Sequence, residues 1–533
     1  MLETVSKKAE LEEGSEAVRQ ILREIYRSRK ISTKELSHRT QLPIPVTAAV
    51  RRELEKAGLL TRNGGASLTT NGEKFVREQL GFVYPQRLIC PTCNGRRVEV
   101  PNEFRSILEK LTKHLSSRPR PLPWLDQAHG TPETALLRAL FMLERGDVEG
   151  RRIVFLGDDD LTSIAVGLLR AAEKIVIVDV DARLIEAVQS ISAKEDLQIT
   201  TLKSDLREPL PERLRHKYDV VFTDPPYTIT GLTLFISRGV EALQRRTGAV
   251  VYLAFAHQSP RRMVIMQRIL NRMGLAIVEQ TPRFNKYIGA EMFANTTSLL
   301  RLVTSEKVKP LVTGTYLGKL YTGEITQTTR TYQCSCGQRT EVGSTENIRT
   351  IEELKTKGCS KCGKTKGFKL MSKAKSKETL RSSLILRSFE WRDFPAILEF
   401  EKQIAIKSFP EAPILDLEYH KQKLEKAIKR KTENLKVAVL NDEIVGWLWL
   451  KTEKDRNTNE KFGYVKSIFV EPSHRHQGFG TELMQAAERY FLSRGIRRTD
   501  LIVSAANYEG ELFFELMAFE RQHSTMRKTL GKQ

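Results

Sequence analysis

Two separate stretches of the chain combine a run of apolar residues with a cluster of acidic ones. They are Arg152–Ala165 (RIVFLGDDDLTSIA) and Asp219–Thr228 (DVVFTDPPYT). Each begins with β-branched and other apolar residues, the pattern of a strand buried on both faces in a parallel sheet. Each ends in carboxylates where a strand would pass into a loop. Because ligands of open α/β sheets bind at the carboxyl ends of the strands, we expect a binding site here.

Helix-like and strand-like hydrophobic periods alternate along residues 116–305. The pattern predicts strands at Ile153–Leu156, Ile175–Val180, Ile199–Leu202, Val220–Thr223 and Ala249–Phe255, with helices at Leu161–Ala171, Ala182–Ile191 and near Leu232–Leu243. A further helix is expected after Thr131, an N-cap residue followed by Pro132 at the first helical position. This order predicts a doubly wound sheet of the Rossmann-like methyltransferase type.

The turn after the first predicted strand is acidic. A dinucleotide fold would have G-x-G-x-x-G there, whereas this chain has the single Gly157 followed by Asp158, Asp159 and Asp160. Three carboxylates repel a phosphate and attract a cation. The turn therefore predicts a positively charged substrate, although Asp158 is also well suited to cap the next helix.

Further carboxylates follow the next strands. Asp179-Val-Asp181 stands where an acidic side chain accepts the ribose hydroxyls of a nucleoside, and Asp205 where an adenine amino group is held. Asp224-Pro225-Pro226-Tyr227 offers a carboxylate and an aromatic ring to an amine. A D-P-P-Y motif indicates transfer to an amino nitrogen.

The N-terminal 85 residues have the order helix, helix, helix and hairpin. Helices are expected at 15–27, 33–40 and 46–57, followed by two short strands around an Asn63-Gly64-Gly65 turn and a closing helix. This order predicts a winged helix-turn-helix. Its third helix carries Arg51, Arg52 and Lys56, which suits DNA binding. A dimerisation or substrate-covering module fits the same pattern.

The six cysteines form three close pairs, which in a chain without a secretory signal favour metal over disulfides. Cys334, Cys336, Cys359 and Cys362 have the spacing of a zinc ribbon within residues 306–380, with iron as the main alternative. Cys90 and Cys93, in the connecting segment 86–115, supply only half of a second site or are reduced thiols. Residues 371–381 are expected to form a Lys/Ser-rich linker.

A separate α/β domain is predicted at residues 381–533. A strand at Tyr464–Val470 precedes Arg475-His-Gln-Gly478-Phe-Gly480 and a long helix, so that backbone N–H groups face a pyrophosphate. This loop resembles that of the GNAT acetyltransferases, and the resemblance continues through Asn507. It implies acetyl-CoA binding by Ile468, Val470, Arg475, Gln477, Gly478, Gly480, Asn507 and Tyr508. The usual tyrosine acid is replaced by Phe514, and Tyr508 is a candidate substitute.

Five features occur together over roughly residues 15–305: the winged-helix start, C-x-x-C, DQA…TPET, GDDDLTS and DPPYT. In this combination the chain resembles the branched-chain polyamine synthases of archaea and thermophilic bacteria. The resemblance implies transfer of aminopropyl groups from decarboxylated S-adenosylmethionine to the N4 secondary amine of spermidine. We expect Asp159 to be the base, with Asp160 and Asp224 holding the amine. The other substrate-binding candidates are Asp126, Gln127, Glu133, Asp158, Asp179, Asp181, Asp205, Pro225, Tyr227, Asn285 and Tyr287.

The formal net charge of +22 leaves the partner open. A solvated basic face and nucleic-acid contact both account for it, and abundant Lys, Arg and Glu also suit a thermophile. Two other functions fit parts of the chain: an S-adenosylmethionine-dependent amino-methyltransferase on RNA or DNA, and a polyamine-sensing DNA-binding regulator. The acidic turn disfavours the former because it repels phosphates.

The location and assembly of the protein follow from the remaining features. No apolar run reaches the ~20 residues that span a bilayer, and the polar N-terminus lacks a secretory pattern, so we expect a cytoplasmic protein. Winged-helix pairing favours a homodimer. The acetyltransferase domain is expected to modify either a polyamine made by the same chain or a protein lysine; its acceptor is not set by the sequence.

Overall fold

The computed structural model describes the chain except residues 12, 63, 84, 86–89, 91, 94, 291–292, 323–327, 344–347, 349–350, 376–383, 409–412, 430–432, 456–457, 476–477, 505–506 and 523–533. The chain forms two compact units, Met1–Tyr316 with Leu320–Gly323, and Leu317–Lys319 with Glu324–Gln533. Each is described by itself below. Within the described residues, no helix is both long and apolar enough to cross a membrane.

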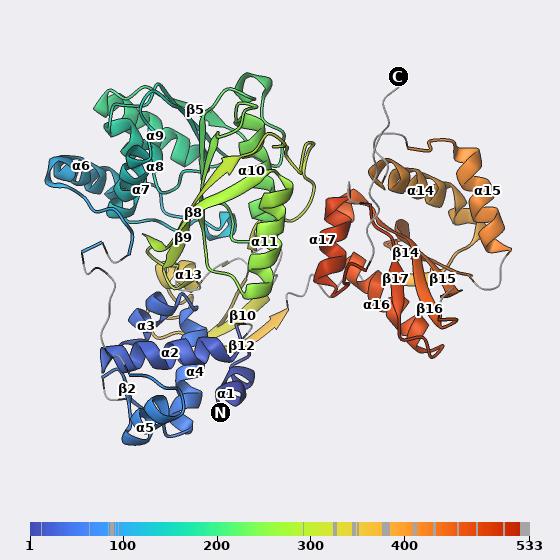
Figure 1. Cartoon of the computed structure of the whole chain (residues 1–533), viewed down its shortest axis with the longest axis horizontal. Coiled ribbons are helices and arrows are strands. Elements are labelled where there is room, and N and C mark those ends of the chain that lie inside the picture. Colours follow the sequence, from blue (N-terminus) through green and yellow to red (C-terminus); the bar gives the residue numbers. More distant parts are fainter. Residues whose placement is uncertain are drawn as a thin grey trace. The chain divides into compact units, whose positions relative to one another are not determined.

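The first unit begins with a helical module that contains one hairpin and closes with a helix (Figure 1). Its elements are α1 (Leu2–Lys8), α2 (Ser15–Ser28), α3 (Thr33–Thr40), α4 (Ile44–Lys56), β1 (Leu60–Arg62), β2 (Ala66–Leu68) and α5 (Thr70–Glu78). Ser32 and Thr69 cap α3 and α5 through their hydroxyl groups. The predicted order of helices and strands is confirmed, and α1 is an additional helix.

Arg51 of this module does not lie on an exposed face. Its side chain is buried, donates to Thr33 and pairs with Glu55 at 3.0 Å. The interpretation that Arg51 contacts DNA is therefore wrong, since the guanidinium is used to hold α3 and α4 together. Arg52 and Lys56 are exposed.

A seven-stranded sheet is the centre of the first unit. Its strands are β3 (Arg152–Leu156), β4 (Lys174–Asp179), β5 (Ile199–Lys203), β6 (Val220–Thr223), β7 (Val250–Phe255), β8 (Leu275–Lys286) and β9 (Thr296–Thr304). The order is β5-β4-β3-β6-β7-β9-β8. The first five strands run parallel, and β9 is antiparallel to both β7 and β8. The doubly wound sheet is as predicted, and β8 and β9 complete it.

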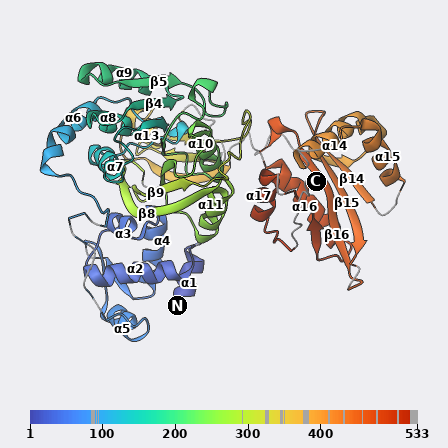
Figure 2. The ribbon, with the colours of Figure 1, turned by 45° about the horizontal axis from the view of Figure 1, so that its top comes forward.

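Helices cover both faces of this sheet (Figure 2). They are α6 (Arg105–Ser116), α7 (Pro132–Glu144), α8 (Thr162–Leu168), α9 (Ala182–Glu195), α10 (Ile229–Ala242) and α11 (Pro260–Arg272), with short 3₁₀ turns at Asn102–Phe104, Pro123–Leu125 and Glu212–Leu214. Helices α6 to α9 share one buried apolar cluster with alternate residues of β3, such as Ile153 and Phe155. Helix α10 packs on the opposite face, where a Cβ at Gly239 would lie 3.1 Å from the Val221 side chain and 3.8 Å from that of Leu156. Helix α8 ends at Leu168, earlier than expected.

The domain with the doubly wound sheet extends past its expected end at residue 305. The guanidinium of Arg238 donates to the carbonyl oxygens of Val312 and Gly314 at 3.2 and 2.7 Å. The N–H of Tyr316 donates to Arg207 at 2.8 Å. These bonds fix residues 306–316 against α10 and the segment after β5, so this stretch belongs to the first unit.

The second unit contains a small sheet and a larger domain. The sheet has the order β11-β10-β12, built from β10 (Thr328–Gln333), β11 (Arg339–Val342) and β12 (Lys369–Lys375), with α13 (Ile351–Lys357) between β11 and β12. The prediction that residues 371–381 are a linker is wrong up to Lys375, because Lys369–Lys375 pairs with β10. The remainder of that stretch lies outside the described residues.

The larger domain has the sheet order β13-β14-β15-β16-β17. Its elements are β13 (Ile385–Ser388), a 3₁₀ turn (Trp391–Asp393), α14 (Phe394–Ser408), α15 (Leu417–Ile428), β14 (Glu433–Leu440), β15 (Glu443–Lys454), β16 (Lys461–Val470), a 3₁₀ turn (Pro472–His474), α16 (Phe479–Leu492), β17 (Thr499–Leu501) and α17 (Tyr508–Leu516). Two apolar clusters lie on its two faces, one with α14 and α15 and one with α16 and α17.

Candidate functional site

A cavity opens at the carboxyl ends of the strands, where the sequence predicts the binding site. Its acidic side chains are Asp126, Asp159, Asp179, Asp205 and Asp224, and Gln127, Ser204, Pro226, Phe235, Leu320 and Tyr321 contribute to its wall. Among the described residues that line it, none is a lysine, an arginine or a histidine. Five carboxylates in one partly enclosed space give a negative potential that attracts cations and repels phosphates.

Asp159 faces this cavity just after the turn at Gly157, whose φ of 73° suits a residue without a side chain. Its carboxylate accepts a hydrogen bond from the N–H of Ala128 at 3.2 Å. Burial and the neighbouring carboxylates Asp160 and Asp224 raise the pKa of Asp159 well above its usual range, although Arg118 opposes the shift. Such a carboxyl group is a strong proton acceptor once a cation favours its ionised form.

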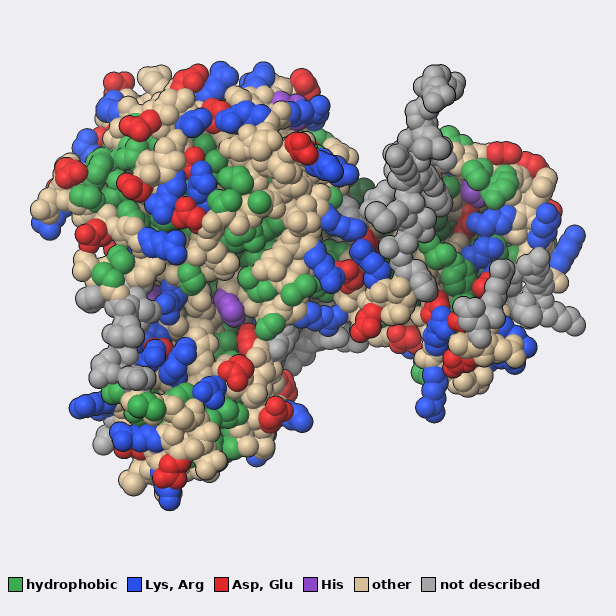
Figure 3. All heavy atoms as spheres, in the orientation of Figure 1, with side chains coloured by type: hydrophobic (Ala, Val, Ile, Leu, Met, Phe, Trp, Pro, Cys, Tyr) green, Lys and Arg blue, Asp and Glu red, His purple; other side chains and the backbone are tan. Residues whose placement is uncertain are grey.

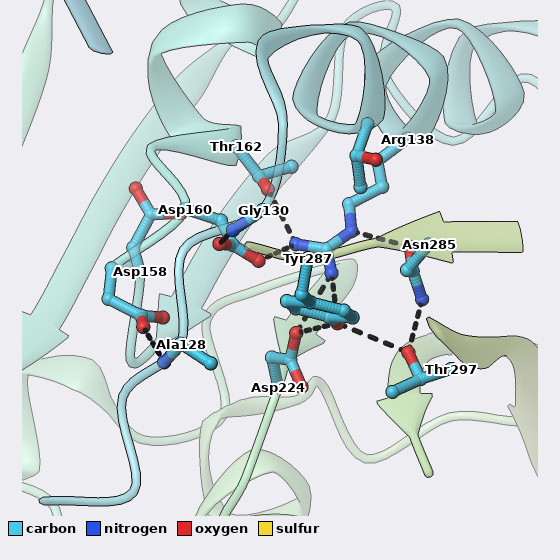
Figure 4. A network of polar contacts seen from close by, with 12 residues as sticks. Ala128, Gly130, Arg138, Asp158, Asp160, Thr162, Asp224, Asn285, Tyr287 and Thr297 are labelled. Carbon is cyan, nitrogen blue, oxygen red and sulfur yellow. Dashed lines mark hydrogen bonds and ion pairs between the residues drawn. The ribbon is translucent and has the colours of Figure 1, made fainter. Parts of the chain in front are cut away.

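A fully buried guanidinium lies behind the cavity (Figure 4). Arg138 of α7 donates to Asp160 at 2.6 Å and to Asp224 at 2.8 Å, so it joins the two loops that carry the predicted catalytic residues. It also donates to Thr162 at 3.1 Å, Asn285 at 2.8 Å and Tyr287 at 2.7 Å. One planar side chain thus links α7, the turn after β3, the end of β6 and the end of β8.

Asp224 is held by two phenols as well as by Arg138. Tyr227 donates to Asp224 Oδ1 at 2.9 Å, and Tyr287 donates to Oδ2. Burial raises the pKa of Asp224 to about 6, while Arg138 and the phenols hold it down. Neither Tyr227 nor Tyr287 is among the described residues that line the cavity, and both phenols donate to the carboxylate of Asp224.

Asp160 points away from the cavity. Its side chain is 2 % exposed, pairs with Arg138 and accepts the N–H of Gly130. A Cβ at Gly130 would lie 2.7 Å from the Asp160 carboxylate, which explains the glycine. Asp160, which is expected to hold the amine, is thus not among the described residues that line the cavity.

Of the carboxylates that follow β3 and β4, Asp179 lines the cavity, whereas Asp158 and Asp181 accept hydrogen bonds from the first turns of helices. Asp179 lines the cavity and accepts the N–H groups of Asp158 and Asp181 at 3.1 and 2.8 Å; burial raises its pKa to about 6. Asp158 is buried and accepts the N–H of Ser163 in the first turn of α8, which favours the capping role. Burial raises the pKa of Asp158 to about 8. Asp181 caps α9 and pairs with Arg183.

The remaining substrate-binding candidates are also divided. Asp126, Gln127 and Asp205 line the cavity. Asp126 accepts from Thr322 at 2.7 Å, and Asp205 accepts the N–H of Arg207 at 2.9 Å. Three others, Glu133, Pro225 and Asn285, are not among the lining residues. Glu133 pairs with Arg96 at 3.3 Å, and Asn285 is buried under Arg138.

Several residues at this site are missing from the sequence predictions, and Arg138, Leu320 and Tyr321 are examples. Arg138 interrupts the apolar stretch ALLRALFM, and a single charge in such a run signals a buried ion pair. Leu320 and Tyr321 lie beyond the expected domain boundary and close one side of the cavity. The ring of Tyr321 also lies 5.3 Å from the guanidinium of Arg207, next to Asp205.

Four cysteines of the second unit converge at one point. The Sγ atoms of Cys334 and Cys362 are 3.6 Å apart, as are those of Cys336 and Cys359, and all four lie within 4.8 Å of one another. Sulfur atoms around a tetrahedral Zn²⁺ at about 2.3 Å lie about 3.8 Å apart, so the four thiols fit that ion. Cys90 is exposed, and the described residues place no third metal-ligating side chain with Cys90 and Cys93.

The predicted acetyl-CoA residues lie at the end of β16 and in the segments that follow it. Gly478, with a φ of 95°, precedes α16, and Arg475 donates through Nε to the carbonyl of Val470 at 2.9 Å. Ile468 and Val470 pack against the cluster on the α16 face, and Gly480 lies close to the Phe513 ring. Asn507 caps α17 by accepting the N–H of Gly510 at 3.2 Å. Gln477 and the side chain of Tyr508 lie outside the described residues.

Phe514 is a core residue of this domain. It is buried in the cluster on the α16 face, with its ring 5.2 and 5.7 Å from the centroids of Phe513 and Phe519. A phenyl ring there carries no proton to donate. Any acid for the thiolate in this domain is therefore another group.

Fold and site define a Rossmann-like transferase with an acidic cavity, and comparisons with known proteins agree. Residues 106–350 match the model of the branched-chain polyamine synthase A C-terminal domain, and residues 390–519 match the GNAT acetyltransferase family. The chain belongs to the branched-chain polyamine synthase family and carries a GNAT domain.

Three relatives place the chain more closely. An uncharacterised protein of Methanocaldococcus jannaschii is 42% identical over 379 residues, covering 71% of this chain and 94% of that protein. The N(4)-bis(aminopropyl)spermidine synthase of the same organism is 34% identical over 46% of this chain and 71% of its own length. The solved branched-chain polyamine synthase of Thermus thermophilus, in complex with N4-aminopropylspermidine and 5′-methylthioadenosine, aligns with a TM-score of 0.50 and 25% identity, covering 61% of this chain and 97% of that chain.

Proposed function

We propose that the first unit transfers aminopropyl groups from decarboxylated S-adenosylmethionine to the N4 secondary amine of spermidine. The observation that carries the proposal is the cavity lining of five carboxylates without a basic side chain among the described residues. The sulfonium donor and the polyammonium acceptor are both cations, and this lining favours both. The same lining disfavours an RNA or DNA methyltransferase, because the phosphates of its substrate would be repelled.

The chemistry assigns one task to each group of residues. The acceptor nitrogen attacks the propyl carbon bonded to the sulfonium, the carbon–sulfur bond breaks, and 5′-methylthioadenosine leaves. Asp159 takes the proton that the nitrogen loses, because it faces the cavity and has a raised pKa. Asp224, oriented by Arg138 and two phenols, holds the amine. Asp179 holds the ribose and Asp205 the adenine, as at the equivalent strand ends of other nucleoside-binding sheets.

The N-terminal module is proposed to be a winged helix that supports the catalytic domain. Arg283 of β8 donates to the carbonyl oxygen of Arg39 in α3 at 2.8 Å, which ties the module to the sheet. The burial of Arg51 removes one of three cations from its third helix. Both observations favour the covering role over DNA binding; the homodimer and the cytoplasmic location stay predictions.

Two bound groups, a zinc ion and acetyl-CoA, are proposed for the second unit. Cys334, Cys336, Cys359 and Cys362 would hold a structural zinc ion, which would fix the small sheet to the loop before β12. The GNAT domain would bind acetyl-CoA at the turn before α16, where Gly478 and the helix N-terminus suit a pyrophosphate. In this account the chain has two transferase activities.

The aminopropyl transfer is tested by mass spectrometry of spermidine incubated with decarboxylated S-adenosylmethionine and the purified chain. Mass gains of one and two aminopropyl units are expected. Spermidine of unchanged mass, together with methyl transfer from S-adenosylmethionine to RNA, would replace the proposal with the methyltransferase function.

A further inference from the structure

A second guanidinium lies next to the acidic turn that follows β3. Arg118, two residues after the end of α6, donates through Nη2 to the carbonyl oxygen of Gly130 at 2.8 Å. Its Nε and Nη1 atoms are buried and have no hydrogen-bond partner among the described residues. Arg138, by contrast, pairs with both Asp160 and Asp224. The charge of Arg138 is therefore balanced by direct partners, whereas that of Arg118 is not.

One short segment connects Arg118 with the carboxylates of the turn. The N–H of Gly130 donates to Asp160 (Figure 4), and the N–H of Ala128 donates to Asp159 at 3.2 Å. The same segment thus carries a carbonyl that accepts from Arg118 and two N–H groups that fix neighbouring carboxylates. Burial lowers the pKa of Arg118, and Asp160 and Asp159 oppose this shift, so the guanidinium lies within electrostatic range of both.

We propose that Arg118 is a positioning residue for aminopropyl transfer: its charge favours the ionised form of Asp159, which is the form that accepts the proton of the attacking nitrogen. The inference rests on the function proposed for the first unit. Arg118 acts through Asp159 and not on the substrate, because it is not among the described residues that line the cavity. The proton passes from the acceptor nitrogen to the carboxylate, and Arg118 keeps its own protons.

Charges on the surface do not replace this effect. On the face of the first unit shown in Figure 3, lysine and arginine side chains are interspersed with aspartate and glutamate side chains. Exposed charges of this kind are screened by water and salt, so each has only a small effect on a group inside the cavity. The buried Nε and Nη1 atoms of Arg118 are screened less. Its position therefore gives Arg118 an influence on Asp159 that an exposed arginine lacks.

The groups around Asp159 are mostly acidic. Burial and the carboxylates of Asp160, Asp224 and Asp179 raise its pKa, and Arg118 opposes them. Removal of the charge of Arg118 therefore raises the pKa of Asp159 further. A smaller fraction of Asp159 is then ionised at a given pH, and the pH range in which it acts as a base moves upward.

Other groups titrate near this site. Burial lowers the pKa of His129 to about 4, and Arg118 adds to the shift, so the imidazole is neutral above about pH 6. Burial raises the pKa values of Asp179 and Asp224 to about 6, so both are mostly ionised above about pH 7. Burial raises the pKa of Asp158 to about 8, within the range of the assay. A comparison in an Asp159→Asn background separates its contribution.

The pH profile of kcat/KM for aminopropyl transfer by the full chain tests the inference. Arg118→Gln keeps a donor for Gly130 but loses the charge, so the acidic limb should move upward by about one pH unit. Its rate should be roughly tenfold lower at pH 7.5 and approach that of the intact chain at pH 10. Arg118→Lys, which keeps the charge, and Arg120→Gln, at an exposed position, should keep the original limb.

Proton release on spermidine binding is a second readout, which does not depend on the reaction. Calorimetry in buffers of different ionisation enthalpy measures it. Its pH midpoint should be about one unit higher in Arg118→Gln, and this difference should vanish in the Asp159→Asn background.

The outcomes separate this inference from the proposed activity. An unchanged limb and midpoint in Arg118→Gln, or an equal shift in the Asp159→Asn background, would overturn it. A limb displaced in Arg118→Lys would also overturn it, whether or not Arg118→Gln folds. Spermidine left unreacted by the intact chain would remove the proposed function, while proton release still decides the role of Arg118.

Discussion

The two cavities of the chain have opposite charge. The cavity of the first unit is lined by five carboxylates, and that of the GNAT domain by three lysines. The formal charge of the whole chain, +22, describes neither. The difference shows that the charge presented inside a cavity follows the few side chains that line it and cannot be read from the net charge of the chain.

The largest expected effect comes from Asp159→Asn in the acidic cavity. Removal of a general base lowers the rate by about 10²–10⁴-fold, while the amide keeps the shape of the side chain. Steady-state aminopropyl transfer measures it, and Glu186→Gln, an exposed carboxylate on α9, is the control. A rate within threefold of the unchanged chain would transfer the role of base to another carboxylate.

Arg138→Met comes next, because it leaves two carboxylates buried without their cation. The free energy of unfolding of the first unit should fall by about 3–5 kcal/mol, as when one partner of a buried ion pair is removed. Denaturant unfolding measures the loss, and Arg120→Met, at an exposed position, should leave stability unchanged. Full stability of Arg138→Met would show that the ion-pair network does not hold the acidic cavity together.

The pH dependence of spermidine binding gives an intermediate effect. Asp179 and Asp224 have pKa values raised by burial to about 6, so both lose charge as the pH falls through 6. Spermidine affinity measured by calorimetry should therefore fall roughly tenfold or more between pH 7.5 and 5.

The same shifts affect the protein without ligand. A carboxyl group whose pKa is raised on folding binds more protons in the folded state, so stability declines as the pH rises from about 4 through the folded pKa. The melting temperature without spermidine should fall between pH 5 and 8, and the stabilisation by spermidine should grow. An opposite trend in both quantities would contradict the assigned pKa directions.

The smallest effect on either cavity should come from removal of the metal. A chelator, or Cys359→Ser, should release about one zinc per chain, as expected for a four-thiolate site. Elemental analysis measures the metal, and Cys90→Ser should retain it. Spermidine affinity should change less than twofold, because none of the four cysteines lines the acidic cavity. A large loss of affinity would show that the cysteine site supports the acidic cavity.

The sheet could be predicted from the sequence because each buried parallel strand is a clear run of apolar residues. The carboxylates at the edge of the sheet could be predicted because the first acidic residue after each run marks the end of that strand. The sequence could not predict which carboxylates face the ligand. Asp159 and Asp160 are neighbours, yet one faces the cavity and the other faces Arg138, since the loop at Gly130 fills the space beside Asp160. That choice depends on contacts between segments far apart in the chain.

The basic cavity was still less accessible to sequence analysis. Lys423, Lys426 and Lys466 come from a helix and a distant strand, and each is an ordinary charged residue in its own segment. Their convergence depends on the bulge that places Lys466 beside Trp449. Motif analysis detected the acetyl-CoA loop because its glycines are local, whereas a cavity assembled from tertiary contacts has no local pattern.

Spermidine binding to the intact chain and to two double variants tests the central claim most directly. In calorimetry at pH 7.5, Asp179→Asn combined with Asp224→Asn should weaken spermidine binding by roughly a hundredfold, because both carboxyl groups have pKa values of about 6 and two charges are removed. Lys426→Gln combined with Lys466→Gln should leave it unchanged. Tighter or additional spermidine binding in the lysine variant only, with no loss in the aspartate variant, would contradict the assignment of cations to the first cavity.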